Sequence, residues 1–594
     1  MRTVASFVPK PLHYLRNLVA FALRNNPLLY FNLPLILVSA GIEILAMSIL
    51  IPLSALAMDQ QLSESSFWAT VLSGLGLPVT PSSLLLLFVV IFSVRIVTQL
   101  ASQSLTFYLG TKIQAELSSQ AFARVVQDYS LREIEDKSVG FFIGIAGDEA
   151  SRAGTIITSL NQFFALFVLA LLYYLTIFYY SAVTGIAVLV FLVVSFVCLI
   201  GAFRKSHQLG ERQIGQRRTA YSVFLDSLNG LRTIRAFSAT EYVSRDYESI
   251  ISRYARTAFA IEFLNLVARS TPILILLASA GIFVGLGVVK IDTGSQFAFL
   301  VTMLVYLMRF FPSVGQCLNI FIRIIADTKA GKDVTAVLSA GGEGEKSHGT
   351  RLLTDQVGEV TCDGVGFSYG DEKWVLKDLD LRLERGKSYA LVGPSGVGKS
   401  TLVDLLVGLY GPNKGQIRID GVAIDDIEVG SLRRKVILLG QRTTVFNNTV
   451  ANNVKMGFEN VSDEEVREAC RTACIDEHIC SLRDGYKTVL TYQGTNFSGG
   501  QLQRLGIARA LLRSPDVLVL DESTSAIDAS TRGAVVDNIL RKYADRIVLM
   551  VSHDQVILDK VTTVIDFLKI NSAPPPSVQN AVALYPVGDR ALGE

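Results

Sequence analysis

Charged residues are scarce in this chain. They make up 18% of its 594 residues, and hydrophobic residues make up 50%, whereas a soluble protein carries about 25% charged residues. This composition excludes a disordered chain and a disulfide-rich secreted scaffold, and it argues against a fully soluble protein. The net charge of +2 is too close to neutral to indicate nucleic-acid binding. We therefore expect no nucleic-acid partner.

Metal-binding cysteine patterns are also lacking. The chain has six cysteines, and the three that lie close together, Cys470, Cys474 and Cys480, lack the paired spacing and the histidines of a zinc site. We expect free thiols in a reducing compartment. Residues 1–27 carry no signal-peptide cleavage pattern, so the first long apolar run is expected to remain as a membrane anchor.

Long hydrophobic runs dominate the first half of the chain. A span needs about 20 apolar residues. Six spans are predicted, at residues 28–57, 83–109, 157–180, 182–203, 260–289 and 296–322. The connections at 110–155 and 204–258 are rich in Lys and Arg, whereas the loop at 58–82 has neither. The positive-inside rule therefore places the N-terminus, both long connections and the second half of the chain in the cytoplasm, at what we expect to be a bacterial inner membrane.

Composition divides the chain into five expected segments. These are a cytoplasmic N-terminal segment at 1–27, a six-span transmembrane domain at 28–325, a linker at 326–350, a soluble α/β domain at 351–570 and a tail at 571–594. The linker is Gly-rich and charged over 339–349, which is typical of a flexible segment. In the soluble domain, apolar strands at 388–392, 436–439, 517–520 and 547–551 alternate with helical patterns.

A phosphate-binding loop follows the first of these strands and precedes a helical run. Its residues match the pattern G-x₄-G-K-[ST]: Gly393, Pro394, Ser395, Gly396, Val397, Gly398, Lys399, Ser400 and Thr401. Glycines allow the backbone N–H groups to turn toward phosphate oxygens, and the helix N-terminus adds a positive dipole end. We expect Lys399 to bind the β- and γ-phosphates of a nucleotide and Ser400 to ligate Mg²⁺.

Two carboxylates follow the strand at 517–520. Asp521 is placed to hold Mg²⁺, and Glu522 is placed to polarise the attacking water. Phosphoryl transfer needs both an anchored metal and a positioned nucleophile. The soluble domain is therefore predicted to be a P-loop NTPase, joined to a polytopic α-helical membrane domain with long cytoplasmic extensions.

The segment Asn496-Phe-Ser-Gly-Gly-Gln501 lies before a helical run and just upstream of Asp521 and Glu522. It resembles the signature loop of ATP-binding cassette (ABC) proteins. The resemblance covers the whole soluble domain, and the six spans with long cytoplasmic helices resemble the membrane domain of ABC exporters. It implies that ATP and Mg²⁺ are the ligands of the soluble domain.

The resemblance also implies roles for single residues that occur in the family's order. Tyr369 resembles the aromatic residue that stacks on adenine, and Gln441 resembles the glutamine that senses Mg²⁺ and the membrane domain. Asp528 lies in a loop that resembles the one communicating between paired sites. His553 resembles the switch histidine that contacts the γ-phosphate, and with Glu522 it forms the expected catalytic pair.

In this family the signature residues cap ATP that is held by the opposite cassette. The matching residues here are Ser498, Gly499, Gly500 and Gln501. A chain with one cassette and six spans is therefore expected to act as a homodimer, with two ATP molecules at the interface. The sequence departs from the family pattern at Phe497 and Ile527, where leucine is usual, and residues 491–495 lack the usual Glu-Arg pair.

The cargo is less clear from the sequence. Arg95, Arg269 and Arg309 lie inside predicted spans, where a charge must face a cavity or a partner. They are expected to line a pocket for an anionic head group, or else to pair with Glu43 or Glu262 or to lie near the end of a span. Phe67, Trp68, Val71, Leu72 and Leu75 recur at helical spacing and predict an amphipathic helix at the outer interface. Together these features resemble lipid-linked oligosaccharide flippases.

Transport requires a mechanical link between the cassette and the membrane domain. Two segments, at 128–144 and 238–250, resemble the short transverse helices at the tips of an exporter's cytoplasmic loops. A multidrug or peptide exporter stays open as an alternative, and so does an ATP-gated channel on the same scaffold. Six fused spans exclude a soluble ABC ATPase, and the fusion of both domains argues against an importer.

Overall fold

The structure is a computed structural model that describes residues 12–56, 67–285, 294–339, 349–370, 373–458, 460–491 and 494–571. The chain forms two compact units, Met1–Gly341 and Gly342–Glu594. Each unit has its own buried hydrophobic clusters. The Gly-rich part of the expected linker and the expected C-terminal tail lie almost entirely outside the described residues.

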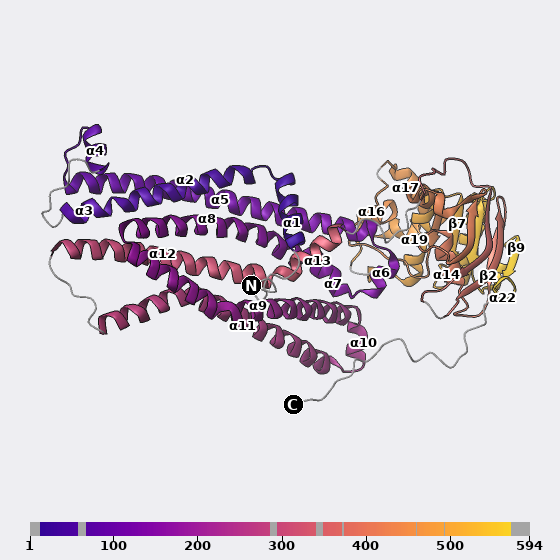
Figure 1. Ribbon diagram of the computed structural model, residues 1–594. Coiled ribbons are helices and arrows are strands. Elements are labelled where there is room, and N and C mark those ends of the chain that lie inside the picture. The colour runs from indigo at the N-terminus through magenta and orange to yellow at the C-terminus, as the bar shows by residue number, and fades with distance from the viewer. Residues whose placement is uncertain are drawn as a thin grey trace, which may run out of the picture. The chain divides into compact units, whose positions relative to one another are not determined.

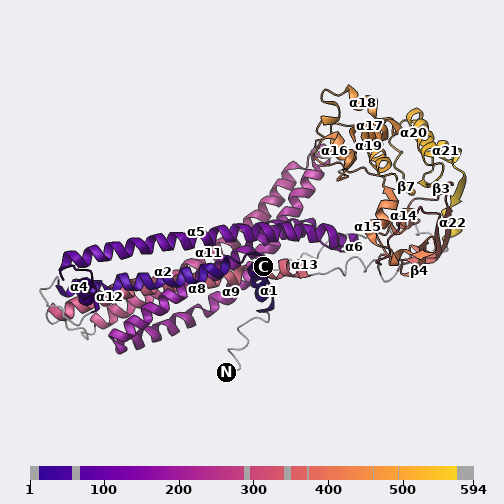
Figure 2. The ribbon, with the colours of Figure 1, turned by 90° about the horizontal axis from the view of Figure 1, so that it is seen from above.

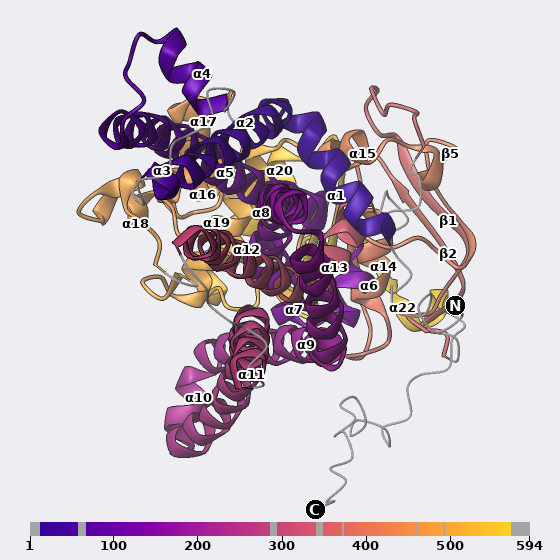
Figure 3. The same ribbon diagram turned by 60° about the vertical axis from the view of Figure 1, so that its left-hand side comes forward.

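The first unit is helical throughout its described residues (Figure 1). Its helices are α1 (Leu12–Asn25), α2 (Leu29–Ser48), α3 (Leu50–Leu56), α4 (Phe67–Gly74), α5 (Pro81–Asp128), α6 (Leu131–Asp136), α7 (Val139–Gly144), the π-helix η1 (Ile145–Glu149), α8 (Ala150–Tyr180), α9 (Ala182–Asn229), α10 (Leu231–Ala236), α11 (Thr240–Gly285), α12 (Gly294–Ala326) and α13 (Thr328–Ser339). Figure 3 shows several of the long helices nearly end-on.

Six helical stretches in this unit are long and apolar enough to cross a membrane, which confirms the predicted number of spans. Helices α5 and α9 have 48 residues each, or about 70 Å at 1.5 Å per residue. The hydrocarbon core of a bilayer is about 30 Å thick. Both helices must therefore continue well beyond the membrane, as the long polar connections predict. Ser181 separates α8 from α9 and caps α9 by accepting the Thr184 N–H.

Short helices occupy the turns at the far ends of these long helices. Figure 1 shows α4 at one end of the helical unit and α10 at the other. Helices α6 and α7 fall within the segment 128–144, where a transverse helix was expected. The second expectation was misplaced, because the separate short helix is α10 and α11 already begins at Thr240. Two backbone breaks set this position: Gly230 ends α9, and Ser238 adopts a left-handed φ of 53°.

Two helices lie where the sequence predicted only connecting segments. Helix α1 falls within the expected N-terminal segment, and α13 falls within the expected linker. Both belong to one buried cluster: Leu18 and Ala22 of α1 pack with Val334 and Val337 of α13. The first half of the expected linker is therefore part of the helical core of this unit.

The predicted amphipathic helix is present as α4. Trp68 and Leu72 are buried and pack with Ile49 and Leu84, and the Trp68 indole N–H donates to Ser48 Oγ at 3.1 Å. Phe67 and Leu75 are exposed. Helix α4 thus lies on the ends of α3 and α5 and leaves large apolar side chains facing outward.

The second unit contains two β-sheets (Figure 2). One has the order β2-β1-β4-β5, and its registered pairs are antiparallel. Its strands are β1 (Glu359–Phe367), β2 (Leu376–Glu384), β4 (Lys414–Ile419) and β5 (Val422–Ala423). The other is parallel, with the order β6-β7-β8-β3-β9. Its strands are β3 (Ser388–Val392), β6 (Val436–Leu439), β7 (Val517–Asp521), β8 (Ile547–Val551) and β9 (Thr563–Asp566).

The parallel sheet confirms all four strands that were placed from the sequence, because β3, β6, β7 and β8 coincide with those segments. The residues of β3, β7 and β8 are almost all buried, as expected for a parallel sheet covered on both faces, whereas β6 at the edge of the sheet is partly buried. The α-helices of this unit are α14 (Lys399–Leu406), α15 (Val429–Lys435), α16 (Val450–Lys455), α17 (Asp463–Thr472), α18 (Asp476–Ser481), α19 (Gly499–Leu512), α20 (Ala529–Lys542), α21 (Gln555–Leu558) and α22 (Phe567–Ile570). The fold class predicted from the sequence is therefore observed.

Candidate functional site

The candidate nucleotide site forms at the carboxyl edge of the parallel sheet. The phosphate loop follows β3, Glu522 follows β7, and His553 follows β8. Gln441 comes two residues after β6. Parallel strands end at the same edge of a sheet, and ligands of α/β proteins bind there. The topology thus collects four segments that are far apart in the sequence.

The phosphate loop adopts a backbone that only glycine tolerates well. Gly393, Gly396 and Gly398 have φ values of 155°, 78° and 108°. A Cβ atom on Gly398 would also lie 3.0 Å from Val375 Cγ1. Pro394, Ser395 and Gly396 are exposed, whereas Val397 is buried beneath the loop. The loop therefore presents its backbone to solvent above a fixed apolar base, as a phosphate cradle requires.

The Lys399 ammonium folds back over its own loop. Its Nζ donates to the carbonyl oxygens of Gly393 and Pro394, and it lies 3.5 Å from His553 Nε2. Burial lowers the pKa of Lys399, while the nearby carboxylates of Glu522 and Asp521 act in the opposite direction. The carbonyl contacts hold the cation where a phosphate would provide a stronger, charged partner.

The acidic side of the site fits a magnesium ion. Burial raises the pKa of Asp521, and a hydrogen bond with Ser400 partly offsets this effect. The Gln441 side-chain N–H donates to Glu522 Oε2 at 2.8 Å, and its amide oxygen, to which no hydrogen bond is found among the described residues, can accept or ligate. A hydroxyl, a carboxylate and an amide oxygen are the donors that Mg²⁺ prefers, and it usually takes the rest from water and phosphate. A cation bound here would also offset the desolvation cost of the half-buried Asp521 carboxylate.

Tyr369 lies beside the phosphate loop, on the chain after β1. Its hydroxyl is 3.0 Å from Thr401 Oγ1. Its ring is edge-on to Phe367 and to Tyr410, with centroids 4.9 and 5.5 Å away. Tyr369 remains 42% exposed, so this braced ring offers a surface on which an adenine base could stack.

The signature segment lies at the start of α19. Ser498 caps the helix: its Oγ accepts the Gln501 N–H, and the Gln501 side-chain carbonyl accepts the Ser498 N–H at 2.8 Å. Ser498 and Gly499 are exposed. A Cβ atom on Gly500 would lie 2.7 Å from the Ala526 oxygen, so glycine allows α19 to pack closely against the loop that precedes Asp528.

Asp528 acts mainly on its own helix. It is the N-cap of α20, where its carboxylate accepts the Thr531 N–H and the Ser530 hydroxyl, and these hydrogen bonds lower its pKa. Gln503 was not singled out from the sequence. Its buried amide accepts the Ala526 N–H at 2.8 Å and donates to the Gln441 carbonyl at 3.4 Å. It therefore joins α19 to the loops carrying Gln441 and Asp528, and only the three-dimensional packing reveals it.

A cavity of about 470 Å³ lies in the helical unit, lined by residues of α2, α5, α8, α11 and α12. Its lining includes Arg95, Arg269 and Arg323, together with the carboxamides Gln99, Gln103, Asn161, Gln162, Gln316 and Asn319. Arg95 donates to Glu43 at 2.8 Å, and Glu43 also accepts the Tyr173 hydroxyl at 2.8 Å. Both of the outcomes expected for Arg95 therefore occur together, since it lines the cavity and pairs with Glu43.

Arg309 departs from the sequence expectation. It lies on α12 but is not among the described residues that line the cavity. Gln316, Asn319 and Arg323 form the lining stripe of α12 at helical spacing, and Arg309 lies seven residues before it, or about 10 Å along the axis. Arg323, near the end of α12, provides the third cavity arginine instead. Its cavity-facing position depends on neighbouring helices, which the sequence does not specify.

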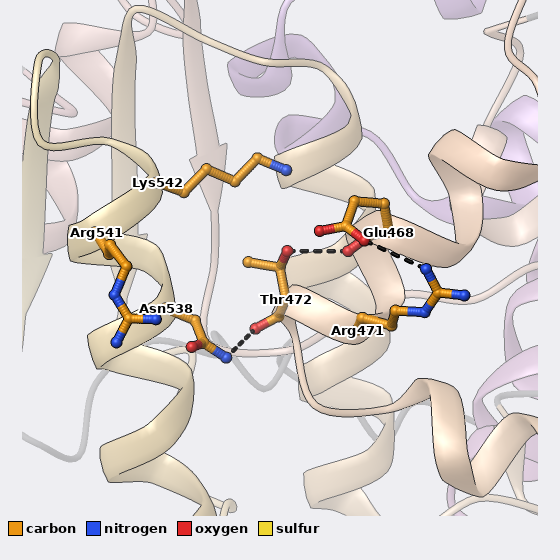
Figure 4. A pocket seen from close by; sticks show the side chains of 6 residues that line it. All are labelled: Glu468, Arg471, Thr472, Asn538, Arg541 and Lys542. Carbon is orange, nitrogen blue, oxygen red and sulfur yellow. Dashed lines mark hydrogen bonds and ion pairs between the residues drawn. The ribbon is translucent and has the colours of Figure 1, made fainter.

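A second hollow of about 450 Å³ lies on the other unit, between α17 and α20 (Figure 4). Asn538 of α20 donates to the Thr472 carbonyl of α17 at 3.2 Å. Arg471 is engaged by Glu468 and Glu464. None of the predicted nucleotide-binding residues is among the described residues lining it, so it is separate from the nucleotide site.

Comparison with known families agrees with both units. Residues 33–314 match the ABC transporter transmembrane region, and residues 376–525 match the ABC transporter domain. The chain is 30% identical, over 68% of each sequence, to an ATP-dependent lipid A-core flippase of Alkalilimnicola ehrlichii. It is 28% identical to a probable ABC transporter ATP-binding/permease protein of Haemophilus influenzae, over 75% of this chain and 81% of that one.

Two further matches show how much of the chain is similar to known proteins. The chain is 31% identical to the heterocyst differentiation ATP-binding protein HepA of Nostoc sp., over 56% of this chain and about half of that protein, 54%. A solved structure of a bacterial Atm1-family ABC exporter with ATP bound has the same fold, with a TM-score of 0.77 at 22% identity, covering 91% of this chain and 94% of that chain. The protein belongs to the ABC transporter family, with the transmembrane region and the ATP-binding domain in a single chain.

Proposed function

We propose that this protein is an ATP-driven exporter or flippase that moves an anionic, lipid-linked substrate from the cytoplasmic side of the membrane outward. The single observation that carries the proposal is the polar, arginine-lined cavity inside a helical unit, in a chain that also carries a candidate ATP site. Charged side chains in a membrane domain are costly unless they face water, a partner or a ligand. The fused ATPase supplies a source of energy for moving that ligand.

In this proposal each residue of the nucleotide site has a defined task. The phosphate loop, with Lys399, holds the phosphates of ATP, and Tyr369 stacks on the adenine. Ser400, Asp521 and Gln441 hold Mg²⁺, which neutralises charge that develops on the transferring phosphoryl group. Glu522 accepts a proton from the attacking water, while Gln441 orients its carboxylate. His553 lies beside Lys399 and is positioned for the γ-phosphate.

The protein works as a homodimer in this scheme. Ser498 and Gly499 are exposed at the N-terminus of the 14-residue helix α19, where the positive end of the helix dipole favours an anion. We infer that they contact the γ-phosphate of ATP bound to a second copy. ATP binding would then close the two copies together, and hydrolysis would separate them.

The substrate is proposed from the chemistry of the cavity. No hydrogen bond or ion pair to the Arg269 or Arg323 side chain is found in the part of the chain that the structure describes. Two cations surrounded by carboxamides suit an anionic head group that also carries hydroxyl or amide groups, such as a phosphorylated glycolipid. The named relative that acts on lipid A-core is consistent with this class. From the Lys- and Arg-rich connections we infer that the ATP site faces the cytoplasm, and we propose a bacterial inner membrane as its location.

The test uses full-length protein in lipid vesicles. ATPase activity and outward movement of fluorescent lipids are measured for an anionic polyprenyl-pyrophosphate glycolipid, for phosphatidylcholine and for a neutral drug-like dye. Stimulation and movement specific to the anionic glycolipid support the proposal. Equal movement of the dye would favour a multidrug exporter, and stimulation by peptides alone would favour a peptide exporter. An ATP-dependent ion current without lipid movement would favour a channel.

A further inference from the structure

The departure at Phe497 has a structural counterpart on a neighbouring helix. Phe497 is 8% exposed, and the ring of His478 on α18 stands edge-on to it, with centroids 5.4 Å apart and an angle of 87°. The two aromatic rings therefore fill the space directly beneath the start of α19. An aromatic pair with this geometry adds stability beyond the area that it buries.

A polar contact continues from His478 to the signature serine. His478 Nδ1 lies 3.5 Å from Gln501 Nε2, and Gln501 Oε1 accepts the Ser498 N–H at 2.8 Å. A carboxamide has one donating end and one accepting end. When its donating end faces the imidazole, its oxygen is directed to Ser498. An acceptor at His478 Nδ1 therefore reinforces the Gln501 orientation that the Ser498 N–H also selects, and with it the helix cap.

In this tautomer the other imidazole nitrogen, Nε2, is left without a hydrogen-bond partner among the described residues. If Nδ1 accepts, Nε2 carries the hydrogen, and Nε2 is buried. A buried donor without a partner is unfavourable. The packing against Phe497 and the contact with Gln501 offset this cost and hold the ring in place. A second link runs in parallel: the Arg504 guanidinium of α19 donates to the Cys474 carbonyl, just before α18.

We propose that His478 is a positioning residue for the signature loop. Its Nδ1 fixes the Gln501 amide so that Ser498 keeps the orientation needed at the γ-phosphate of ATP on a second copy. This inference rests on the proposed homodimeric ATP site. It follows that loss of the acceptor lowers the rate of ATP turnover, while ATP binding to the phosphate loop of the same chain is unaffected.

Two substitutions separate the acceptor from the ring. Asparagine in H478N places an oxygen near the position of Nδ1 but removes the ring, whereas H478F keeps a ring beside Phe497 but removes the acceptor. We expect H478F in the full-length protein to lower kcat about five- to tenfold, the effect of one neutral hydrogen bond, with the KM for ATP unchanged. H478N should recover most of the rate. If H478F is normal and H478N is slow, only packing matters and the inference is wrong.

A double-mutant cycle tests whether His478 acts through Gln501. The variant H478F/Q501A should be no slower than Q501A alone, and losses that multiply would contradict the inference. C480S, at an exposed position of the same helix, is the matched control and should keep the full rate. S498A separates the two proposals: if it leaves turnover unchanged, the homodimeric site itself fails. If S498A is slow but H478F is normal, only the role of His478 is rejected.

Discussion

The nucleotide site and the membrane cavity both contain charged side chains, but they satisfy those charges in different ways. In the nucleotide site, Lys399 binds carbonyl oxygens of its own loop and Glu522 accepts from Gln441. In the cavity, Arg95 has a carboxylate partner in Glu43, whereas the Arg269 and Arg323 side chains have no hydrogen bond or ion pair among the described residues. The proposed nucleotide site is therefore organised by contacts within the chain, whereas the proposed cargo cavity contains two arginines without such a partner among the described residues.

This difference has a consequence for mutagenesis. Changes in the preorganised nucleotide site should affect chemistry steeply, because fixed groups act directly on the developing charge of the transition state. Changes in the cavity should affect the affinity for cargo more gradually, because several side chains from five helices share the contacts. The following experiments test this contrast.

The largest effect is expected for Glu522→Gln. Glutamine can keep the contact with Gln441 but cannot take a proton from water, and loss of a general base costs about 10²- to 10⁴-fold in rate. ATP hydrolysis by the purified protein should fall by that factor, while ATP binding measured by calorimetry should stay normal. Normal turnover in E522Q would show that another group is the base.

A smaller effect is expected for Lys399→Ala. The substitution removes one charged contact to phosphate, which is worth about 1.5–3 kcal/mol, or roughly 10- to 100-fold in affinity. Calorimetry with ATP should show the weaker binding. Lys414, on β4 of the same unit, provides a matched control, and K414A should bind ATP normally. Unchanged affinity in K399A would contradict the assignment of the phosphate loop.

The cavity should respond more weakly still. In R269Q/R323Q, the concentration of anionic glycolipid that half-maximally stimulates the ATPase should rise about tenfold, because two exposed cations contribute modestly in a wet site. Basal ATPase activity should persist. R309Q is the matched control, since Arg309 lies on α12 outside the lining stripe. An equal shift in R309Q would mean that the cavity residues have been misassigned.

The smallest effect concerns the stability of the nucleotide-free protein. Burial raises the pKa of Asp521, so its ionised form is disfavoured in the fold, and that cost appears as the pH rises through the raised pKa. D521N should therefore unfold a few degrees higher than the natural protein at pH 7, the scale of about 1 kcal/mol.

Two further observations check the sign of this prediction. The difference in unfolding temperature should shrink in acid, where Asp521 is protonated and resembles asparagine. Stabilisation by Mg²⁺ and ATP should be weaker in D521N at pH 7, because the carboxylate is lost as a ligand. A lower unfolding temperature for D521N at pH 7 would contradict the assigned burial cost.

Local sequence patterns predicted much of this molecule. The strands β3, β6, β7 and β8 are short apolar runs bounded by polar turns, and the residues at their ends are adjacent because parallel strands share an edge. The antiparallel strands β1, β2 and β4 were not predicted. They alternate buried and exposed positions with many charges, as in the segment Leu376–Glu384, so their hydrophobicity is low. These strands form because they pair with segments far away in the sequence, and such pairing is not visible in the local sequence pattern.

The membrane unit shows the same limit in another form. The segment of helix α13 was predicted to be part of a polar linker. Its charged residues Lys329, Lys332 and Asp333 conceal, in the sequence, that the other face of the helix consists of small and apolar residues. Tyr14 and Ile156 pack directly against Gly331 on that face. A Cβ atom at Gly331 would lie only 2.9 Å from the Tyr14 ring. The choice between Arg309 and Arg323 likewise depends on depth and on neighbouring helices. Periodicity predicts that a helix exists, but it does not specify which neighbours cover each turn.

The pairing of Arg95 with Glu43 has an electrical consequence. Among the described lining residues, three arginines and one glutamate leave the cavity with an excess of two positive charges. A cargo carrying two negative charges for each copy of the chain would make the loaded cavity neutral. Because the membrane potential does work only on net charge that crosses the field, such a complex would reorient at a rate independent of voltage, whereas the empty cavity would feel the field on its return.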